Sequence, residues 1–290
     1  MSLSKTLQSP NILSMIVGKS FDEMKDILLV QGSEYYANNS QEGETIRQNL
    51  ASFGLPSDMD TVKRVQENVI YHYVEKLLPL AGTPAQLAEF IEKRVDFSQA
   101  KDLISSALQN GSVLTAVSHF GGVECIVPTS MYLKFTLNAV LKFTTQNFSD
   151  KLQNYGKLME ESGLFAPINF IEIGKPGSHS ALLMGRALNK KEILFTVFDE
   201  ETPHSIPVKL FNRSVLGGAG LDRLLKLARG NVTVFNTFMI REGENYRLQL
   251  FPVDINAENF IQQMYNDLQS VLEKHYEQWY FLHEEIPFAD

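Results

Sequence analysis

The feature that most restricts the fold of this chain is a change in hydrophobic period near Gly111. Between about residues 18 and 110, apolar residues recur three and four positions apart, and several segments begin with Ser, Thr or Asp and stop at Gly. This spacing is typical of amphipathic helices with capped ends. After Gly111, short β-branched or aromatic runs alternate with helical segments, which indicates a largely parallel sheet covered by helices. The sequence therefore predicts an α/β protein with a helical N-terminal section.

The expected elements can be placed along the chain. Helices are expected at 20–32, 44–54, 58–82, 83–97 and 98–111, and one or two more at 256–285. Strands are expected at 112–118, 137–144, 169–174, 192–198, 232–240 and 246–253, with a strand or hairpin arm at 205–211. No repeat or linker separates residues 1–110 from residues 111–290, so the helical section is expected to pack on the α/β core as one unit.

Composition argues against several classes of protein. Cys125 is the only cysteine, which rules out an internal disulfide framework and suits a reducing cytoplasm. A net charge of −8 without a run of Lys or Arg argues against a nucleic-acid binder. No stretch approaches the ~18 to 20 apolar residues that cross a bilayer, and the first residues lack the pattern of a secretion signal. A cytoplasmic protein without a transmembrane segment is expected.

One expected strand leads into a candidate catalytic pair. The stretch "VLTAVSHFGGVECIVPTS" begins as an apolar strand, reaches His119, passes Gly121 and Gly122, and continues as a helical pattern that carries Glu124. Ligands of open α/β sheets gather at the carboxyl ends of the strands. If Glu124 bound one ring nitrogen of His119, the other nitrogen could remove a proton from a hydroxyl or an amine. The pair is a candidate general base that needs no covalent intermediate.

Plainer interpretations stand beside this one. With six histidines and 34 acidic residues, a pair at this spacing arises readily by chance, and a lone pair is more often structural. Cys125 lies six residues after His119 and could instead be a nucleophile, as in a hydrolase, although a thiol on an apolar helix is more often only buried. Spacing alone does not decide between these alternatives.

Four further histidines and a cluster of glycines do not suggest a cofactor. His179, His204, His275 and His283 lack zinc-binding spacing. The glycines at 217, 218 and 220 fit neither the Walker loop nor the dinucleotide fingerprint. Neither a metal ion nor a nucleotide cofactor is therefore expected.

Several segments have a recognisable order. In "SHFGGVE" an acid follows the histidine by five residues, and "KKEILFTVFDEE" is a strand that ends in Asp199. An aromatic turn, a helix, a strand and a closing hairpin follow in "VKLFNRSVLGGAGLDRLLKLARGNVTVFNTFMIREGENYRLQLFPV". "ETIRQNLASFG" lies upstream, and "HYEQWYFLHEE" closes the chain. Over roughly residues 40 to 285, this ordered set resembles the late acyltransferases of lipid A biosynthesis, the lauroyl and myristoyl transferases of the lysophospholipid acyltransferase superfamily.

The resemblance implies a fold like that of glycerolphosphate acyltransferase. It also implies transfer of a fatty-acyl group from an acyl carrier protein or a coenzyme A thioester. His119 would deprotonate the acceptor hydroxyl or amine, and Glu124 would orient His119. Lys142, where the family usually has arginine, would stabilise the oxyanion. Asp199 and Arg213 would complete the site.

The chain also departs from that family. Members usually begin with a membrane-anchoring helix, whereas this chain has only the short apolar patch "ILSMIV" and lacks the flanking basic residues. The ordinary lipid A precursor is therefore not the expected acceptor. A small molecule, a sugar, a lipid or a carrier-bound intermediate stays open, and so does peripheral contact with the inner membrane.

A basic segment and two further functions complete the expectations. The segment "GGAGLDRLLKLARG" is expected to be a helix with Arg223, Lys226 and Arg229 at three-residue steps. This stripe could dock an acidic acyl carrier protein or be only a solvated face. A thioesterase stays open as an alternative. A catalytically degenerate protein that binds acyl chains or a partner also stays open, because lysine replaces the usual arginine at Lys142.

Overall fold

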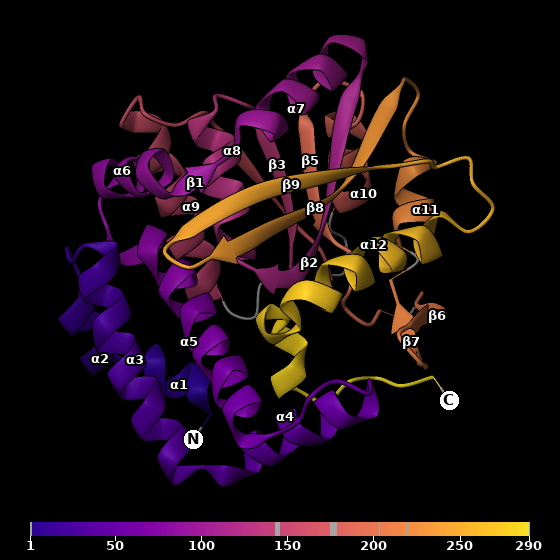
Figure 1. Cartoon of the computed structure of the whole chain (residues 1–290). Helices are drawn as coiled ribbons and strands as arrows, with labels where there is room; N and C mark the ends of the chain where they lie inside the picture. The colour runs from indigo at the N-terminus through magenta and orange to yellow at the C-terminus, as the bar shows by residue number, and fades with distance from the viewer. Residues whose placement is uncertain (1, 143–145, 175–178, 203, 219, 290) are drawn as a thin grey trace.

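The computed structural model describes residues 2–142, 146–174, 179–202, 204–218 and 220–289. Within these ranges, a seven-stranded sheet has the order β1-β9-β8-β2-β5-β3-β4 (Figure 1). Its strands are β1 (Val95–Asp96), β2 (Ser112–Gly121), β3 (Leu137–Leu141), β4 (Ile168–Glu172), β5 (Ile193–Val197), β8 (Val232–Glu242) and β9 (Asn245–Val253). All its neighbouring strands in this part of the chain are parallel except β8 and β9. The predicted α/β class with a mostly parallel sheet is confirmed.

Local sequence explains where several helices begin. At the start of α3 (Phe21–Asn38), Ser20 and Glu23 each bind the other's backbone N–H, which forms a capping box. Thr83 and Gln86 do the same at the start of α6 (Pro84–Arg94), whose first residue is proline. The other α-helices are α1 (Leu3–Leu7), α2 (Pro10–Ile16), α4 (Ser40–Ser52), α5 (Met59–Ala81), α7 (Ser98–Asn110), α8 (Ile126–Tyr132), α9 (Gln146–Glu161), α10 (Ser180–Ala187), α11 (Gly220–Leu225) and α12 (Phe260–His275).

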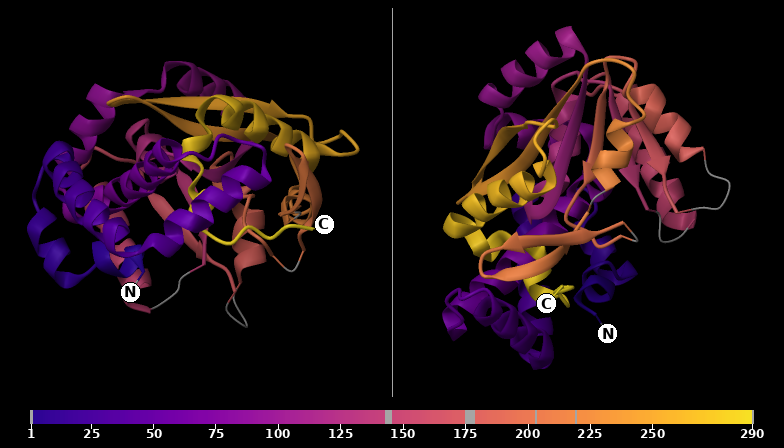
Figure 2. Two further views of the ribbon diagram at one scale, coloured as in Figure 1. Left: turned by 60° about the horizontal axis from the view of Figure 1, so that its bottom comes forward. Right: turned by 90° about the vertical axis from the view of Figure 1, so that its right-hand side faces the viewer.

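The helical N-terminal section lies beside one end of the sheet. Helices α1 to α5 gather below the sheet in Figure 1, and other helices lie on both sides of it (Figure 2, right). One cluster of buried apolar residues includes Leu28 and Val69 from the helical section and Leu114 and Met239 from the sheet. The helical section thus shares its hydrophobic core with the sheet.

Within the described ranges, no helix combines the length and the apolar character needed to cross a lipid bilayer.

The segment around residue 210 forms a second, smaller sheet. The strand or hairpin arm expected at 205–211 is β6 (Ile206–Leu210), which pairs antiparallel with β7 (Arg213–Gly217). Strand β1 was missed, because two residues are too few to show a period. Residues 143 and 144 of the expected strand 137–144 lie outside the described residues, and so does Ala219 of the expected helix.

The expected basic helix is shorter than predicted. Helix α11 ends at Leu225, so Lys226 and Arg229 follow the helix and do not lie on it. A tight turn follows the helix, in which the backbone N–H of Leu227 donates to the Leu224 carbonyl and that of Ala228 donates to the Leu225 carbonyl. The Arg229 N–H donates to the side chain of Asn189 at 2.8 Å. The prediction of three basic residues on one helix was therefore wrong, because this turn directs the chain toward the loop after α10.

Candidate active site

Strands β2 and β5 pair as far as Val117 and Val197, and a polar residue follows soon after on each chain segment: His119, still within β2, and Asp199, just after β5. Val117 pairs with Val197, and His119 and Asp199 each lie two residues further along the chain. His119 Nδ1 lies 2.9 Å from Asp199 Oδ1, and the His119 backbone N–H donates to Asp199 Oδ2 at 2.8 Å. The Asp199 side chain is only 1% exposed. This buried carboxylate fixes both the ring and the backbone of His119.

The second ring nitrogen of His119 faces a more open environment. His119 Nε2 lies 3.4 Å from Glu200 Oε1, and the Glu200 side chain is 57% exposed while that of His119 is 20% exposed. The Phe281 ring lies 4.8 Å from the imidazole, centre to centre. Trp279 donates its indole N–H to Asp199 Oδ2 at 3.4 Å. The ring is therefore held at Nδ1 by a buried carboxylate, while its Nε2 faces an exposed one.

The charges around His119 change its protonation. Burial alone lowers the pKa of His119, but the charge and hydrogen bond of Asp199, with the charges of Glu200 and Glu124, outweigh burial and raise this pKa to about 9. In the free protein at neutral pH, the imidazole is therefore mostly protonated.

Glu124 does not occupy the place predicted for it. It lies on a 3₁₀ turn, η1 (Val123–Cys125), before α8 begins. Its Oε1 lies 3.4 Å from His72 Nε2 and 3.7 Å from Lys76 Nζ, both on α5. The prediction that Glu124 binds the His119 ring was wrong. Asp199 binds Nδ1 instead, and the turn after β2 places Glu124 beside α5. Glu124 still raises the pKa of His119 through its charge.

A buried network that the sequence analysis missed holds the turn after His119. Arg241 on β8 pairs with Glu75 on α5 through two N–H groups, and Glu75 is fully buried. The same guanidinium donates to the Gly121 carbonyl at 2.6 Å. Gly121 has φ +58°, and a Cβ there would lie 2.0 Å from the Met239 carbonyl oxygen, so the turn requires glycine.

The C-terminal segment closes this network from the other side. Gln278 lies in a 3₁₀ turn, η2 (Tyr276–Gln278), and its side chain accepts from the Arg241 backbone N–H and donates to the Arg241 carbonyl, both at 3.0 Å. Tyr246 donates its hydroxyl to Glu75 at 2.9 Å. The next turn, η3 (Tyr280–His283), brings Tyr280 and Phe281 beside His119. The helical section, the sheet and the C-terminus therefore all meet at the His119 turn.

The other predicted site residues are more dispersed. Lys142 is exposed directly after β3, at the same edge of the sheet but two strands away from β2. Arg213 begins β7, and its guanidinium lies 4.1 Å from the centre of the Phe288 ring. Their roles in oxyanion stabilisation and substrate binding stay predictions. Cys125 is buried, and burial raises the pKa of its thiol well above the ordinary value, which disfavours the thiolate that a nucleophile needs.

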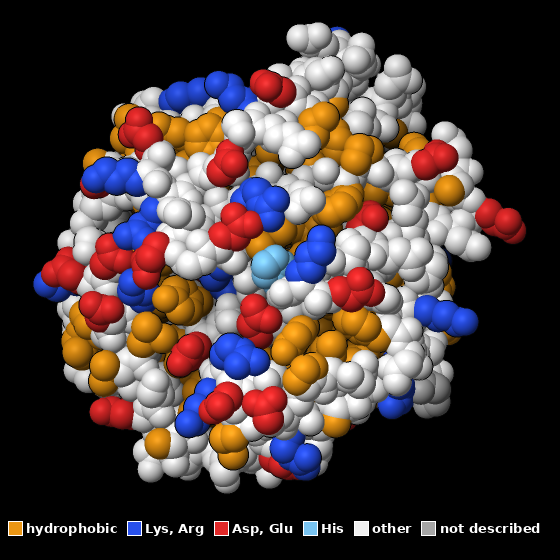
Figure 3. All heavy atoms as spheres, viewed as in Figure 1, with side chains coloured by type: hydrophobic (Ala, Val, Ile, Leu, Met, Phe, Trp, Pro, Cys, Tyr) orange, Lys and Arg blue, Asp and Glu red, His pale blue; other side chains and the backbone are white. Residues whose placement is uncertain are grey.

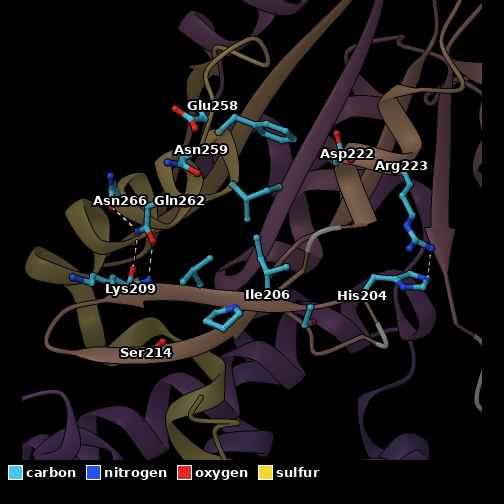
Figure 4. A pocket seen from close by; sticks show the side chains of 15 residues that line it. His204, Ile206, Lys209, Ser214, Asp222, Arg223, Glu258, Asn259, Gln262 and Asn266 are labelled. Carbon is cyan, nitrogen blue, oxygen red and sulfur yellow. Dashed lines mark hydrogen bonds between the residues drawn. The ribbon is translucent and has the colours of Figure 1, made fainter. Parts of the chain in front are cut away.

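A hollow of about 1040 Å³ lies between the β6–β7 hairpin, α11 and α12, and His119 is not among its lining residues (Figure 4). Arg223 Nη1 lies 3.0 Å from His204 Nε2 at one end of it. Lys226 instead pairs with Asp222 at 2.6 Å. The three predicted carrier-docking residues thus do not form one stripe. On the face drawn in Figure 3, basic and acidic side chains are interspersed.

Among the residues that the structure describes, no group of three or more His, Cys, Asp or Glu side chains lies close enough to hold a metal ion. No protein-family model matches the sequence, and a search of curated proteins finds no significant match. Function therefore has to be inferred from the site itself.

Proposed function

We propose that the protein is an acyltransferase that moves a fatty-acyl group from an acyl carrier protein or coenzyme A thioester to a hydroxyl or amine acceptor. The observation that carries the proposal is the His119–Asp199 pair, in which a buried carboxylate holds Nδ1 and Nε2 does not bind Asp199 but faces the exposed Glu200 side chain. The ordered resemblance of residues 40 to 285 to the lipid A late acyltransferases supports the same reaction and a glycerolphosphate-acyltransferase-like fold.

The reaction needs one base and one site for negative charge. Neutral His119 takes the proton of the acceptor while the acceptor oxygen or nitrogen attacks the thioester carbonyl. Asp199 stabilises the resulting imidazolium. When the tetrahedral intermediate collapses, the C–S bond breaks and the imidazolium returns its proton to the leaving thiolate. An ester or amide and a free thiol result, and Lys142 is the proposed cation for the oxyanion.

The raised pKa of His119 sets a condition on this mechanism. A general base must be neutral, so a pKa of about 9 leaves only a small fraction active at pH 7. A bound substrate that displaces Glu200 from Nε2 would remove one of the charges that raise this pKa. Because only the neutral ring can accept a proton, the acyl-transfer rate is expected to rise with pH.

Two other functions compete with transfer. A thioesterase would use the same base to activate water in place of the acceptor. A degenerate protein would bind acyl chains or a partner without turnover. For the enzyme, we propose a place in the cytoplasm or against the inner membrane, and a small molecule, a sugar or a lipid as acceptor.

The test is thiol release by the purified chain from acyl-coenzyme A and acyl-carrier thioesters, with and without pooled amine, sugar and lipid acceptors. Transfer predicts acceptor-dependent release and an acylated product, both lost in His119→Gln and kept in the surface control Lys93→Gln, whose side chain is 69% exposed on α6. Equal release of free acid without acceptor would indicate a thioesterase, and binding without turnover would indicate a degenerate protein. Unchanged transfer by His119→Gln would rule out the proposed base.

A further inference from the structure

One face of α5 presents polar side chains to the turn after β2. Asn68 and His72 are four residues apart, His72 and Glu75 three, and His72 and Lys76 four, so each of the other three is a neighbour of His72 on one side of the helix. Asn68 and Glu75 bind Arg241, which holds the Gly121 carbonyl. The other two, His72 and Lys76, contact Glu124. A helix from the N-terminal section thus holds the turn and its acidic residue at once.

His72 is the buried member of the pair that contacts Glu124. It is 4% exposed, and its ring centre lies 4.3 Å from that of Tyr280. Burial, together with the positive charges of Lys76, His119, Arg241 and His283, lowers the pKa of His72 well below 6.5. The ring is therefore neutral, and a carboxylate can only accept a hydrogen bond. The nitrogen that lies 3.4 Å from Glu124 Oε1 is Nε2, so a ring proton on Nε2 would face the carboxylate.

The other nitrogen of this ring is not satisfied. Among the described residues, His72 Nδ1 is buried without a hydrogen-bond partner. An unsatisfied buried nitrogen opposes folding, and an apolar ring would fill the same place beside Tyr280 without that penalty. A histidine here therefore needs a compensating contact, and the contact that the structure gives it is Glu124.

We infer that His72 is a positioning residue, which holds the Glu124 carboxylate near His119 so that Glu124 supports the protonated imidazole from a distance. The inference rests on the proposed function and deepens it. Asp199 binds the ring directly, whereas Glu124 adds only its charge. Lys76 is the second partner of Glu124, at 3.7 Å, and its side chain is 31% exposed, whereas that of His72 is 5% exposed.

Substitutions that keep or remove a donor at Nε2 test the inference. The amide nitrogen of Gln can replace Nε2–H, whereas the shorter Asn places its amide near Nδ1. The measurement is the ring pKa of His119 by NMR in histidine-labelled protein. Glu124→Gln is expected to lower it by roughly 0.5 to 1 unit. His72→Asn should lower it by a comparable amount, and His72→Gln should leave it near the wild-type value.

A double variant separates positioning from a general structural effect. In the Glu124→Gln background, His72→Asn should change the His119 pKa no further, because the charge that His72 positions is already absent. His72→Phe keeps the ring against Tyr280 and removes the unsatisfied nitrogen, so it should fold even if His72→Asn does not, and it should give the same lowered pKa. Equal shifts in His72→Gln and His72→Asn, no shift in His72→Phe, or additive shifts in the double variant would overturn the inference.

Turnover gives an independent readout. The pH at which the acyl-transfer rate levels off should move down in His72→Asn by the same amount as the ring pKa, and should stay in place in His72→Gln. If the wild-type protein transfers no acyl group, the proposed function fails, whereas the NMR comparison still decides whether His72 positions Glu124.

Discussion

Two pairs of opposite charge lie near the Gly121 turn, and they differ in exposure: the cationic side chain is 6% exposed in Arg241 and 20% exposed in His119. Glu75 and Arg241 are buried, and Arg241 binds a carboxylate, a carbonyl and a side-chain amide. In the pair of His119 and Asp199, the carboxylate is also buried, but the His119 side chain is 20% exposed and its second nitrogen faces the exposed Glu200. A sealed pair can hold structure, whereas a pair with one open edge can also exchange a proton with a substrate.

The largest expected effect comes from the carboxylate of the open pair. Asp199→Asn should lower the acyl-transfer rate by about 10²- to 10⁴-fold, because an amide cannot stabilise the imidazolium and would donate to Nδ1, leaving the ring proton on Nε2. Steady-state transfer assays at saturating donor measure this loss. The matched control is Glu201→Gln, which removes an exposed charge two residues along the chain. A transfer rate for Asp199→Asn within twofold of the wild-type rate would contradict the role of Asp199 in supporting His119.

The sealed pair should instead control stability. Arg241→Gln leaves Glu75 buried without its cation, so the free energy of unfolding should fall by about 3 to 5 kcal/mol. Urea denaturation followed by circular dichroism measures the loss. Arg247→Gln removes an exposed ion pair with Glu242 and should cost less than about 1 kcal/mol. The double variant Glu75→Leu with Arg241→Met should regain much of the stability. An equal loss of unfolding free energy in Arg241→Gln and Arg247→Gln would contradict a structural role for the buried pair.

The open pair should also contribute to stability, in a way that depends on pH. The folded pKa of His119, about 9, is above its ordinary value of 6.5, so the stabilisation is complete below pH 6.5 and is lost as pH rises through 9. The pKa difference corresponds to about 3 kcal/mol. Unfolding curves of the wild type and His119→Gln, compared from pH 6 to 10, should converge by that amount. A stability difference between the two proteins that grows with rising pH would contradict a raised pKa of His119.

The smallest effect is expected from Glu200. This carboxylate is more than half exposed, so salt and water screen its charge on His119. Glu200→Gln should lower the pH at which transfer levels off by less than about one unit, and the effect should shrink as ionic strength rises. An increase in that pH would contradict the contact between Glu200 and Nε2.

The sequence predicted the open pair better than the sealed one. A strand period followed by two glycines predicted His119 near a strand end, and the resemblance to the acyltransferases placed Asp199 in the same site, although neither predicted that Asp199 binds the His119 ring. The Glu124 contact was misplaced because β2 continues to Gly121 and α8 begins only after η1, which local patterns do not reveal.

The sealed pair depends on packing between distant parts of the chain. Glu75 and Arg241 are 166 residues apart, and no local period links α5 to β8. One signal was available in the stretch "VIYHYVEKLL", in which His72 and Glu75 interrupt an otherwise largely apolar run within an expected helix. Polar residues inside such a run indicate a buried polar network, although they do not name its partners.

The central claim is that Asp199, and not Glu124, holds His119 as a base. The most direct measurement is the ring pKa of His119 by NMR in the wild type, Asp199→Asn and Glu124→Gln. We predict about 9 in the wild type, a fall to the ordinary value of 6.5 or below in Asp199→Asn, and a much smaller fall in Glu124→Gln. A wild-type pKa at or below 6.5, or a larger fall in Glu124→Gln than in Asp199→Asn, would contradict the claim.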